Sequence, residues 1–453
     1  MDAAALIAAW EKRFGPYERH PASAPDPDRL AAAWEEFAVR MEDHYPFFHP
    51  RFAGQMLKPP HPVAVAAYEA AMRINPNNHA LDGCPGTSSL EVEVVEQLAA
   101  MFGLPAPSLG HLTSSGTIAN LEALWVAREL RPGERVVHSE EAHYTHGRMC
   151  QVLGVEATAV PATPEGRIDL DAVETQCRRG NVGTVVLTPG TTVVGSVDRV
   201  DEALALRERY GVRLHADAAY GGFFALLGRA EDPLVAPGPF EALAACDSIV
   251  VDPHKHGLQP YGCGAVLFAD PSVGRLYKHD SPYTYFTGFA SGELHLGEIS
   301  LECSRAGAAA AALWLTLRAF PLEADAGLGP ILAAGRRAAL DWATRLEASD
   351  VLRPHLVPEL DIVTFLPAAA SLSGLDGASA AVLEAGMSDP DDPVFLSVLH
   401  VGREALLARH PELEDDADGA RILRSVLMKP EHEPFVGRLH ARVESLAREV
   451  LEQ

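Results

Sequence analysis

This sequence of 453 residues lacks paired cysteines. Its six cysteines are scattered along the chain, and no two of them form a Cys-x-x-Cys pair. Zinc sites with sulfur ligands and the disulfide frameworks of small secreted domains both depend on closely spaced cysteines, so we expect neither here. Scattered free cysteines are typical of a reducing compartment, and we expect the protein in the cytoplasm, without a bound metal.

Long apolar runs and an excess of basic residues are also absent. No apolar run approaches the ~18–20 residues that a membrane-spanning helix needs, and the first residues, MDAAALIAAWEKRF, lack the basic leader of a signal peptide. Lysine and arginine number 37 against 62 acidic residues, so the formal net charge is −25. A chain this acidic offers no basic face to nucleic acid or to an anionic membrane, and we expect neither as a partner.

The order of apolar patterns predicts an α/β protein. Between roughly residues 110 and 270, short apolar runs alternate with helix-spaced segments, which favours a mostly parallel sheet with helices on both faces. A helix is expected before this region, with Ser89 as its N-cap and Gly103 just past its end. The pattern of apolar runs and helix-spaced segments changes near residue 320. We therefore divide the chain into an N-terminal helical segment (1–60), a large domain (61–320) and a small C-terminal domain (321–453).

Four polar clusters follow expected strands or precede expected helices. In open α/β sheets, ligands bind at the carboxyl ends of the strands, so these clusters are expected to gather at one edge. Taken singly, each cluster also fits a structural role, as a helix cap, a hydrogen-bonding histidine or a surface lysine. The clusters are TSSGTIAN (113–120), HSEEAHYTH (138–146), HADAAYGG (215–222) and DPHKHG (252–257).

Together the clusters supply the groups that pyridoxal phosphate (PLP) requires. Small hydroxyl residues and a glycine ahead of a helix form a cradle for a phosphate. Asp217 can keep a pyridine nitrogen protonated, and Lys255, which is set between two apolar runs, can form a Schiff base with the aldehyde. A flat ring also needs a stacking partner on one face and a small side chain on the other. The sequence therefore predicts a PLP enzyme.

These motifs resemble those of the group II PLP-dependent amino acid decarboxylases, the family of glutamate, aromatic amino acid and archaeal tyrosine/aspartate decarboxylases. The resemblance covers roughly residues 50 to 320. It implies the fold type I, aspartate aminotransferase-like architecture, with a mostly parallel central sheet in the large domain and a smaller C-terminal α/β domain. It also implies a homodimer with the active site at the subunit interface, and decarboxylation of an L-amino acid to its amine and CO2.

The same resemblance implies roles for individual residues. DPHKHG makes Lys255 the Schiff-base lysine and His254 a contact of the phosphate or the substrate. HADAAYGG makes Asp217 the partner of the pyridine nitrogen and puts Ala219 against one face of the ring, with His143 on the other face. Further cofactor contacts that the resemblance implies are Ser115, Gly116, Thr117 and Thr192.

One departure from the family pattern lies in the segment 281–297. Relatives carry a tyrosine on a mobile loop there, and this sequence does not clearly show it. An acid has to protonate Cα after CO2 has left, and we favour His295 over Tyr285 because an unperturbed histidine pKa of about 6.5 suits a proton donor at neutral pH. The stretches around Arg305 and Gln55 also resemble the family, but neutral Gln55 does not select between an acidic and an aromatic substrate.

Two other classes of function stay open. The same scaffold could support other PLP chemistry, as an aldolase, a carbon–sulfur lyase or an oxidative deaminase. It could also bind partners or sense the cofactor without turnover. The presence of Lys255, Asp217 and His143 argues against this, because a protein that is not selected for catalysis could lose these residues. Release of CO2 from labelled amino acids distinguishes these possibilities.

Overall fold

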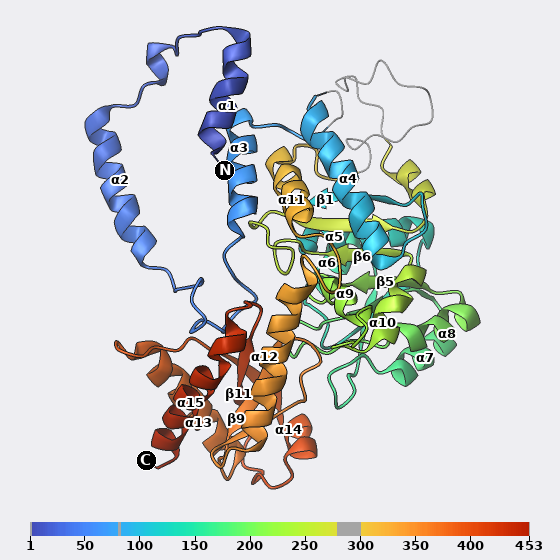
Figure 1. Cartoon of the computed structure of the whole chain (residues 1–453). Helices are drawn as coiled ribbons and strands as arrows, with labels where there is room; N and C mark the ends of the chain where they lie inside the picture. Colours follow the sequence, from blue (N-terminus) through green and yellow to red (C-terminus); the bar gives the residue numbers. More distant parts are fainter. Residues whose placement is uncertain (1, 80–82, 279–299, 453) are drawn as a thin grey trace.

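The computed structural model describes residues 2–79, 83–278 and 300–452, and Figure 1 shows its layout. An N-terminal arm of helices leads into a body that is built on a large sheet, and the C-terminal part lies against one end of this body. The helices are α1 Ala3–Glu11, α2 Pro27–Glu42, α3 Pro62–Ile74, α4 Pro85–Phe102, α5 Gly116–Leu130, α6 Thr145–Leu153, α7 Leu170–Arg179, α8 Val200–Tyr210, α9 Ala225–Gly228, α10 Pro237–Glu241, α11 Gly307–Ala319, α12 Gly329–Glu347, α13 Leu372–Ser388, α14 Arg403–Arg409 and α15 His432–Leu451. The strands are β1 Leu109–Thr113, β2 Arg135–Ser139, β3 Ala157–Val160, β4 Val182–Leu187, β5 Arg213–Asp217, β6 Ser248–Val251, β7 Gly264–Phe268, β8 Leu352–Pro354, β9 Ile362–Pro367, β10 Ser397–Gly402 and β11 Gly419–Val426.

The large sheet has seven strands in the order β1-β7-β6-β5-β4-β2-β3. Strands β2 to β6 pair in parallel, and β7 runs antiparallel to both of its neighbours, β6 and β1. Every residue of β4 is buried, as is typical of a central strand that helices cover on both faces. The expected mostly parallel α/β sheet is confirmed.

Two details of this region differ from the sequence prediction. The helix α4 begins at Pro85 with Cys84 as its N-cap, so the prediction of Ser89 as the cap is wrong. Proline at the first helical position presets the backbone, and the helix therefore starts earlier than the hydroxyl residues suggest. Its end is confirmed, because Gly103 adopts the left-handed conformation with φ 72°. Strand β1, LGHLT, was not predicted, because a glycine and a histidine interrupt its apolar pattern.

The C-terminal part carries a second sheet of four antiparallel strands in the order β10-β11-β9-β8. Helices α12, α13 and α15 pack around it, with a core that includes Trp342 and Phe365. The expected smaller C-terminal α/β unit is therefore confirmed. Leu360, Ile362 and Val426 belong to the core of the large sheet, so the two sheets share an apolar contact. The domain boundaries at residues 60 and 320 stay predictions.

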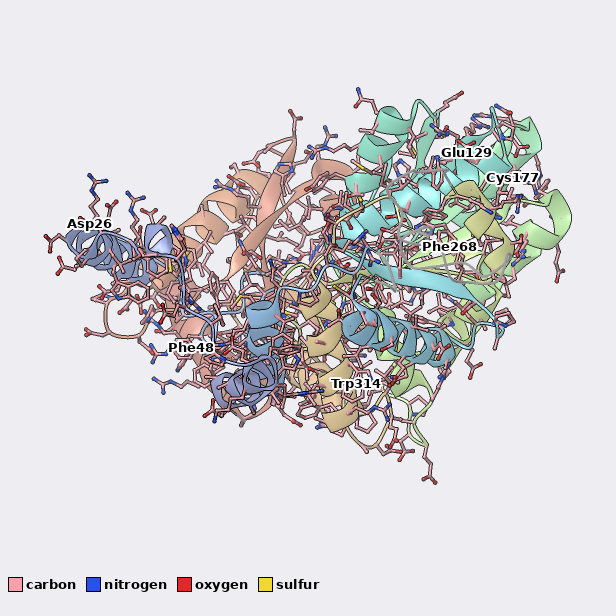
Figure 2. The ribbon with its side chains drawn as sticks, turned by 90° about the horizontal axis from the view of Figure 1, so that it is seen from above. Asp26, Phe48, Glu129, Cys177, Phe268 and Trp314 are labelled. Carbon is pink, nitrogen blue, oxygen red and sulfur yellow. The ribbon has the colours of Figure 1, made fainter. Side chains whose placement is uncertain are left out.

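The N-terminal arm extends away from the body. Helix α1 packs on α3 through Ala3 and Ile7, but every residue from 8 to 45 is exposed. Figure 2 shows α2, whose N-cap Asp26 is labelled, standing apart from the sheet that contains Phe268. None of the helices that the structure describes is long and apolar enough to cross a membrane. A location in the cytoplasm stays a prediction.

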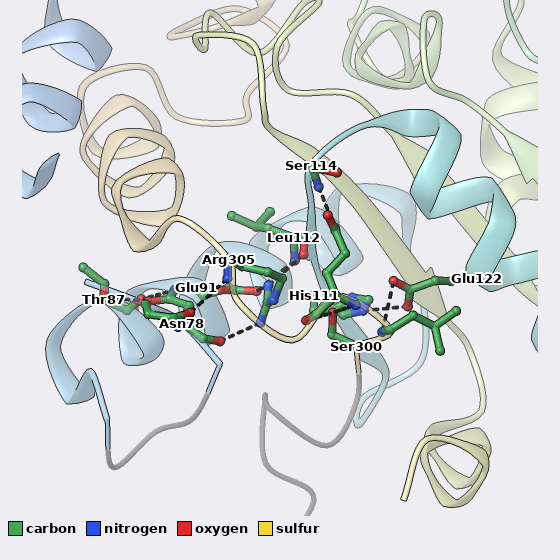
Figure 3. Close-up of polar contacts among 12 residues, drawn as sticks. Asn78, Thr87, Glu91, His111, Leu112, Ser114, Glu122, Ser300 and Arg305 are labelled. Carbon is green, nitrogen blue, oxygen red and sulfur yellow. Dashed lines mark hydrogen bonds and ion pairs between the residues drawn. The ribbon is translucent and has the colours of Figure 1, made fainter. Parts of the chain in front are cut away.

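A buried ion pair fixes the segment around Arg305 against α4 and β1 (Figure 3). The Arg305 guanidinium pairs with Glu91 of α4 and donates hydrogen bonds to the carbonyls of Leu112 and Asn78, at 2.7 and 2.9 Å. Glu91 also accepts hydrogen bonds from the Leu112 amide (2.9 Å) and from the Asn78 side chain (2.7 Å). Arg305 is not in the lining of the predicted site, and its contacts join four segments of the chain.

This network predicts that Glu91→Gln lowers the unfolding temperature strongly. The substitution leaves the Arg305 charge buried without its partner, and breaking a buried pair costs about 3–5 kcal/mol, which corresponds to a shift on the order of 5 °C or more. Thermal unfolding followed by intrinsic fluorescence measures the shift. Glu96→Gln, on the exposed side of the same helix, is the control and is expected to change little. Equal unfolding temperatures for the two variants would contradict the structural role of the pair.

Candidate active site

A cavity of about 210 Å³ lies at the carboxyl edge of the large sheet. The segments that follow β1, β2, β4, β5 and β6 border it, so the four polar clusters meet there as expected. A larger cavity, of about 580 Å³, lies beside β10, but none of the predicted site residues lines it, and we assign the site to the smaller cavity. The predicted residues in its lining are Ser115, Gly116, Thr117, His143, Thr192, Asp217, Ala219, His254 and Lys255.

Lys255 lies in the connection between β6 and β7, two adjacent antiparallel strands. This connection, residues 252–263, contains no helix, and the two paired strands hold it at both ends. The backbone amide of His254 donates a hydrogen bond to the Cys263 carbonyl (3.1 Å), and the ring Nδ1 of His254 lies 2.7 Å from the same oxygen. The Lys255 ammonium is 3.0 Å from Asp252 Oδ2. The lysine is thus directed into the cavity from a short, cross-linked loop.

The N-terminus of α5 borders the cavity at the place where the sequence predicts an anion cradle. Ser115 is the N-cap of α5 and accepts a hydrogen bond from the Ile118 amide. The same residue also lines the cavity. Gly116 approaches Asp252 closely, because a Cβ atom on this glycine would lie 2.6 Å from the carboxylate. Thr117 follows, with its hydroxyl 3.4 Å from that of Thr145. Free backbone amides, hydroxyl groups and the helix dipole together suit a phosphate.

Asp217 ends β5 and is 4% exposed. Its Oδ2 accepts a hydrogen bond from His146 Nε2 at 2.8 Å, and its Oδ1 accepts a longer one from the Ala219 amide at 3.3 Å. Burial by itself would raise the pKa of Asp217. The hydrogen bond from His146, and then the charges of His146 and Lys255, outweigh burial and hold the pKa of Asp217 well below its usual range, so the side chain is a carboxylate at neutral pH.

His143, Ala219 and Thr192 complete the predicted part of the lining. His143 lies after β2, with its ring Nδ1 2.7 Å from the Thr145 hydroxyl, and burial lowers its pKa. Ala219 follows Asp217 by two residues and presents only a methyl group. Thr192 lies on the loop after β4, which Arg424 of β11 holds by donating hydrogen bonds to the carbonyls of Thr192 (2.8 Å) and Val193 (2.7 Å).

The sequence motifs do not by themselves assign several of the residues that line the cavity. Each lies within five residues of a predicted site residue, so nearness to the motifs was the available signal, but nothing in the pattern showed which neighbours face the cavity. Gln55, by contrast, is exposed and does not line the cavity. His295 and Tyr285 lie outside the described residues, and the expected proton donor stays a prediction. The unassigned lining residues are Asn120, Tyr144, Thr145, Thr188, Gly190, Tyr220 and Asp252.

The residues present fit PLP. The cradle at α5 offers donors for a phosphate, and Gly116 leaves room where a side chain would collide. At the end of β5, the ionised Asp217 can accept a hydrogen bond from a protonated ring nitrogen. Lys255 provides an amine at the end of β6. An anion site, a carboxylate and a primary amine in one cavity are the three groups that this cofactor needs.

Comparison with known proteins gives a family and two kinds of relatives. The family model described as the pyridoxal-dependent decarboxylase conserved domain matches residues 46–324. An L-tyrosine decarboxylase of Enterococcus faecium is 29% identical over 393 residues, which cover 66% of this chain and 64% of that protein. A probable L-tyrosine/L-aspartate decarboxylase of Methanopyrus kandleri is 34% identical over 233 residues, which cover 51% and 61%. The chain thus matches less than two thirds of the length of these relatives.

Among solved structures, Oryza sativa TDC with PLP and tryptamine resembles this chain with a TM-score of 0.77 at 18% identity. The match covers 98% of this chain and 96% of the other, and at this identity it shows the fold alone. The family model, however, spans more than half of the chain and includes every residue that lines the cavity. The chain therefore belongs to the pyridoxal-dependent decarboxylase family.

Proposed function

We propose that the protein is a PLP-dependent decarboxylase that converts an L-amino acid to its amine and CO2, with Lys255 as the Schiff-base lysine. The observation that carries this proposal is the meeting of Lys255, Asp217 and the α5 cradle at one cavity. Membership of the family supports the reaction, and so do the names of the relatives. Bound PLP supplies an electron sink for the bond that breaks at Cα.

Each residue of the cavity then has a task. Ser115, Gly116 and Thr117 bind the phosphate through their amides and hydroxyl groups. Asp217 keeps the proton on the ring nitrogen, because a carboxylate partner favours the charged form of the ring. His143 and Ala219 bound the two faces of the ring. Further contacts are assigned to Thr192, near the cofactor hydroxyl and the substrate carboxylate, and to His254.

For the substrate, we place L-tyrosine ahead of L-aspartate. Both appear in the names of the relatives. Within the part of the chain that the structure describes, the cavity lining includes the rings of His143, Tyr144, Tyr220 and His254, and no arginine. An acidic side chain would need a cation besides Lys255, whereas an aromatic side chain can pack against such rings.

We also propose that the protein is a homodimer. On α2, the apolar residues Leu30, Trp34, Phe37 and Met41 recur at helical spacing and form one stripe. All four are exposed, with Trp34 at 66% and Phe37 at 49%. A contiguous apolar stripe of this kind on a projecting arm is typical of a surface that a protein partner covers. A second copy of the chain is the occupant that agrees with the resemblance to dimeric relatives.

The proposed reaction predicts that the PLP-loaded protein releases labelled CO2 from carboxyl-labelled L-amino acids. Release is expected to be fastest with L-tyrosine, slower with L-aspartate and absent with D-tyrosine, because one enantiomer alone directs the carboxylate correctly at the site. Trapped CO2 is counted after incubation with each amino acid, and the amine is identified by mass spectrometry. Products without CO2 release would instead favour an aldolase or a carbon–sulfur lyase, and aldehyde with ammonia would favour an oxidative deaminase.

Borohydride provides the control for this experiment. Reduction of the loaded protein is expected to abolish CO2 release and to leave a pyridoxyl label on Lys255 alone, since the reduced bond can no longer exchange with substrate. Peptide mapping locates the label. A label on Lys58 or Lys278, with Lys255 unmodified, would contradict the assignment.

The role of Asp217 predicts that Asp217→Asn retains bound PLP and loses more than about tenfold in kcat, or over ~1.4 kcal/mol of transition-state stabilisation. A neutral amide cannot keep the ring nitrogen protonated, so the ring becomes a poorer electron sink. Steady-state kinetics and the absorbance of bound cofactor measure the two effects. The control is Asp232→Asn at an exposed position, which is expected to leave both unchanged. A kcat within about tenfold of the wild-type value would remove Asp217 from this role.

The dimer proposal predicts that the double substitution Trp34→Glu/Phe37→Glu converts the dimer to monomers. Two carboxylates within the apolar stripe would have to be desolvated in a covered interface. Light scattering coupled to size-exclusion chromatography gives the mass. Ala32→Glu/Val39→Glu adds the same charge on the opposite side of α2 and is expected to leave a dimer. A monomeric wild-type protein, or equal masses for both variants, would refute the proposed surface.

A further inference from the structure

His146 lies behind Asp217, on the side away from the cavity. It belongs to the first turn of α6 and is completely buried. Its Nε2 is 2.8 Å from Asp217 Oδ2, while the side chain itself does not line the cavity that Asp217 borders. A second-layer residue in this position can act on the site only through the carboxylate. None of the roles proposed above includes this histidine.

The position of the proton on His146 follows from its surroundings. An ionised carboxylate only accepts hydrogen bonds, so Nε2 must carry the hydrogen that points to Asp217. The other ring nitrogen, Nδ1, is buried and finds no hydrogen-bond partner among the described residues. Among the described residues, the contact with Asp217 is therefore the one hydrogen bond that the ring makes.

Three other histidines lie near the ring of His146. The ring of His138 on β2 and that of His215 on β5 each lie 6.2 Å from its centroid, and His143 lies three residues before it. Burial lowers the pKa of His138 and His143, and it lowers that of His215 to about 3. These three rings carry no negative charge, so Asp217 is the anion that faces the histidine.

On the basis of the PLP-dependent function proposed above, we infer that His146 is a positioning residue for Asp217. The Nε2–H group of His146 holds Oδ2, so that Oδ1, which has only the long contact with the Ala219 amide, is free to meet the ring nitrogen of the cofactor. The same hydrogen bond stabilises the carboxylate over the carboxylic acid. It thereby keeps the shared proton on the ring nitrogen instead of on Asp217.

Reconstitution of the apo-protein with PLP that carries ¹⁵N in its ring tests this inference. The wild-type nitrogen is expected in the protonated range of chemical shift. In His146→Phe, which fills the space but cannot donate, the ratio of protonated to unprotonated nitrogen is expected to fall by about tenfold or more, equivalent to ~1.4 kcal/mol. His146→Gln, which can place an amide N–H near the position of Nε2, is expected to restore the wild-type signal. The control is His138→Phe, which removes a neighbouring ring that does not contact Asp217, and it is expected to leave the signal unchanged.

A second measurement requires that only one variant folds, the conservative His146→Gln. In wild-type protein with ¹⁵N-labelled histidine, the signal that disappears in His146→Gln is expected to show a hydrogen on Nε2, the nitrogen that donates to Asp217, from about pH 6 to about pH 8. An Nε2 without a hydrogen in this range would overturn the inference. So would a cofactor signal in His146→Phe that equals the wild type.

The two measurements also separate this inference from the function on which it rests. If the apo-protein does not take up PLP, the proposed function fails, and the histidine spectrum of the apo-protein still reports on the contact between His146 and Asp217. If PLP binds and CO2 is released, but the ring nitrogen is insensitive to position 146, the function stands and the positioning role is refuted.

Discussion

The candidate site depends on the antiparallel pairing of β7 with both β6 and β1. Because β7 runs back beside β6, the chain must reverse between them, and this short reversal carries Lys255. Because β7 also pairs with β1, the segment after β1 lies beside the same reversal. Two glycines allow the contact: Gly116 packs against Asp252, and Gly264 packs against the Ser115 backbone and Asp252. A side chain at either position would force the cradle and the lysine apart.

Behind the cavity, buried polar groups hold the functional ones in place. His215 of β5 lies 2.9 Å from the Ser248 hydroxyl and 2.8 Å from the Asn120 side-chain oxygen, and Asn120 donates to the Gly116 carbonyl at 2.9 Å. The start of α5 is therefore tied to the central strands through one histidine, as Asp217 is tied to α6 through another. Such second-layer contacts fix the orientation of the groups that face a ligand. All of these side chains are buried, so water does not compete for their hydrogen bonds.

The C-terminal sheet takes part in the site through the cavity wall. Tyr220, which lines the cavity, donates a hydrogen bond to Asp361 just before β9, and burial raises the pKa of Asp361 to about 6. Arg424 of β11 holds the loop that carries Thr192. The N-terminal arm contributes nothing to the cavity within the described residues, and its exposed apolar stripe faces away from the chain's own core. The C-terminal part of the chain thus shapes the cavity, whereas the N-terminal arm carries the surface that we propose for association.

The sequence by itself determined the α/β class, the strands β4 to β7 and the residue types of the site, because buried strands read as apolar runs and polar clusters follow β5 and β6. Only the tertiary structure decided which neighbours join the site. Strand β1 has no clear apolar pattern and is defined by its pairing with β7. The spacing of His143 and His146 in the sequence also does not reveal that the first borders the cavity while the second hydrogen-bonds Asp217 from behind. Such contacts join residues far apart in the chain, and strand order and helix rotation, which local patterns do not encode, bring them together.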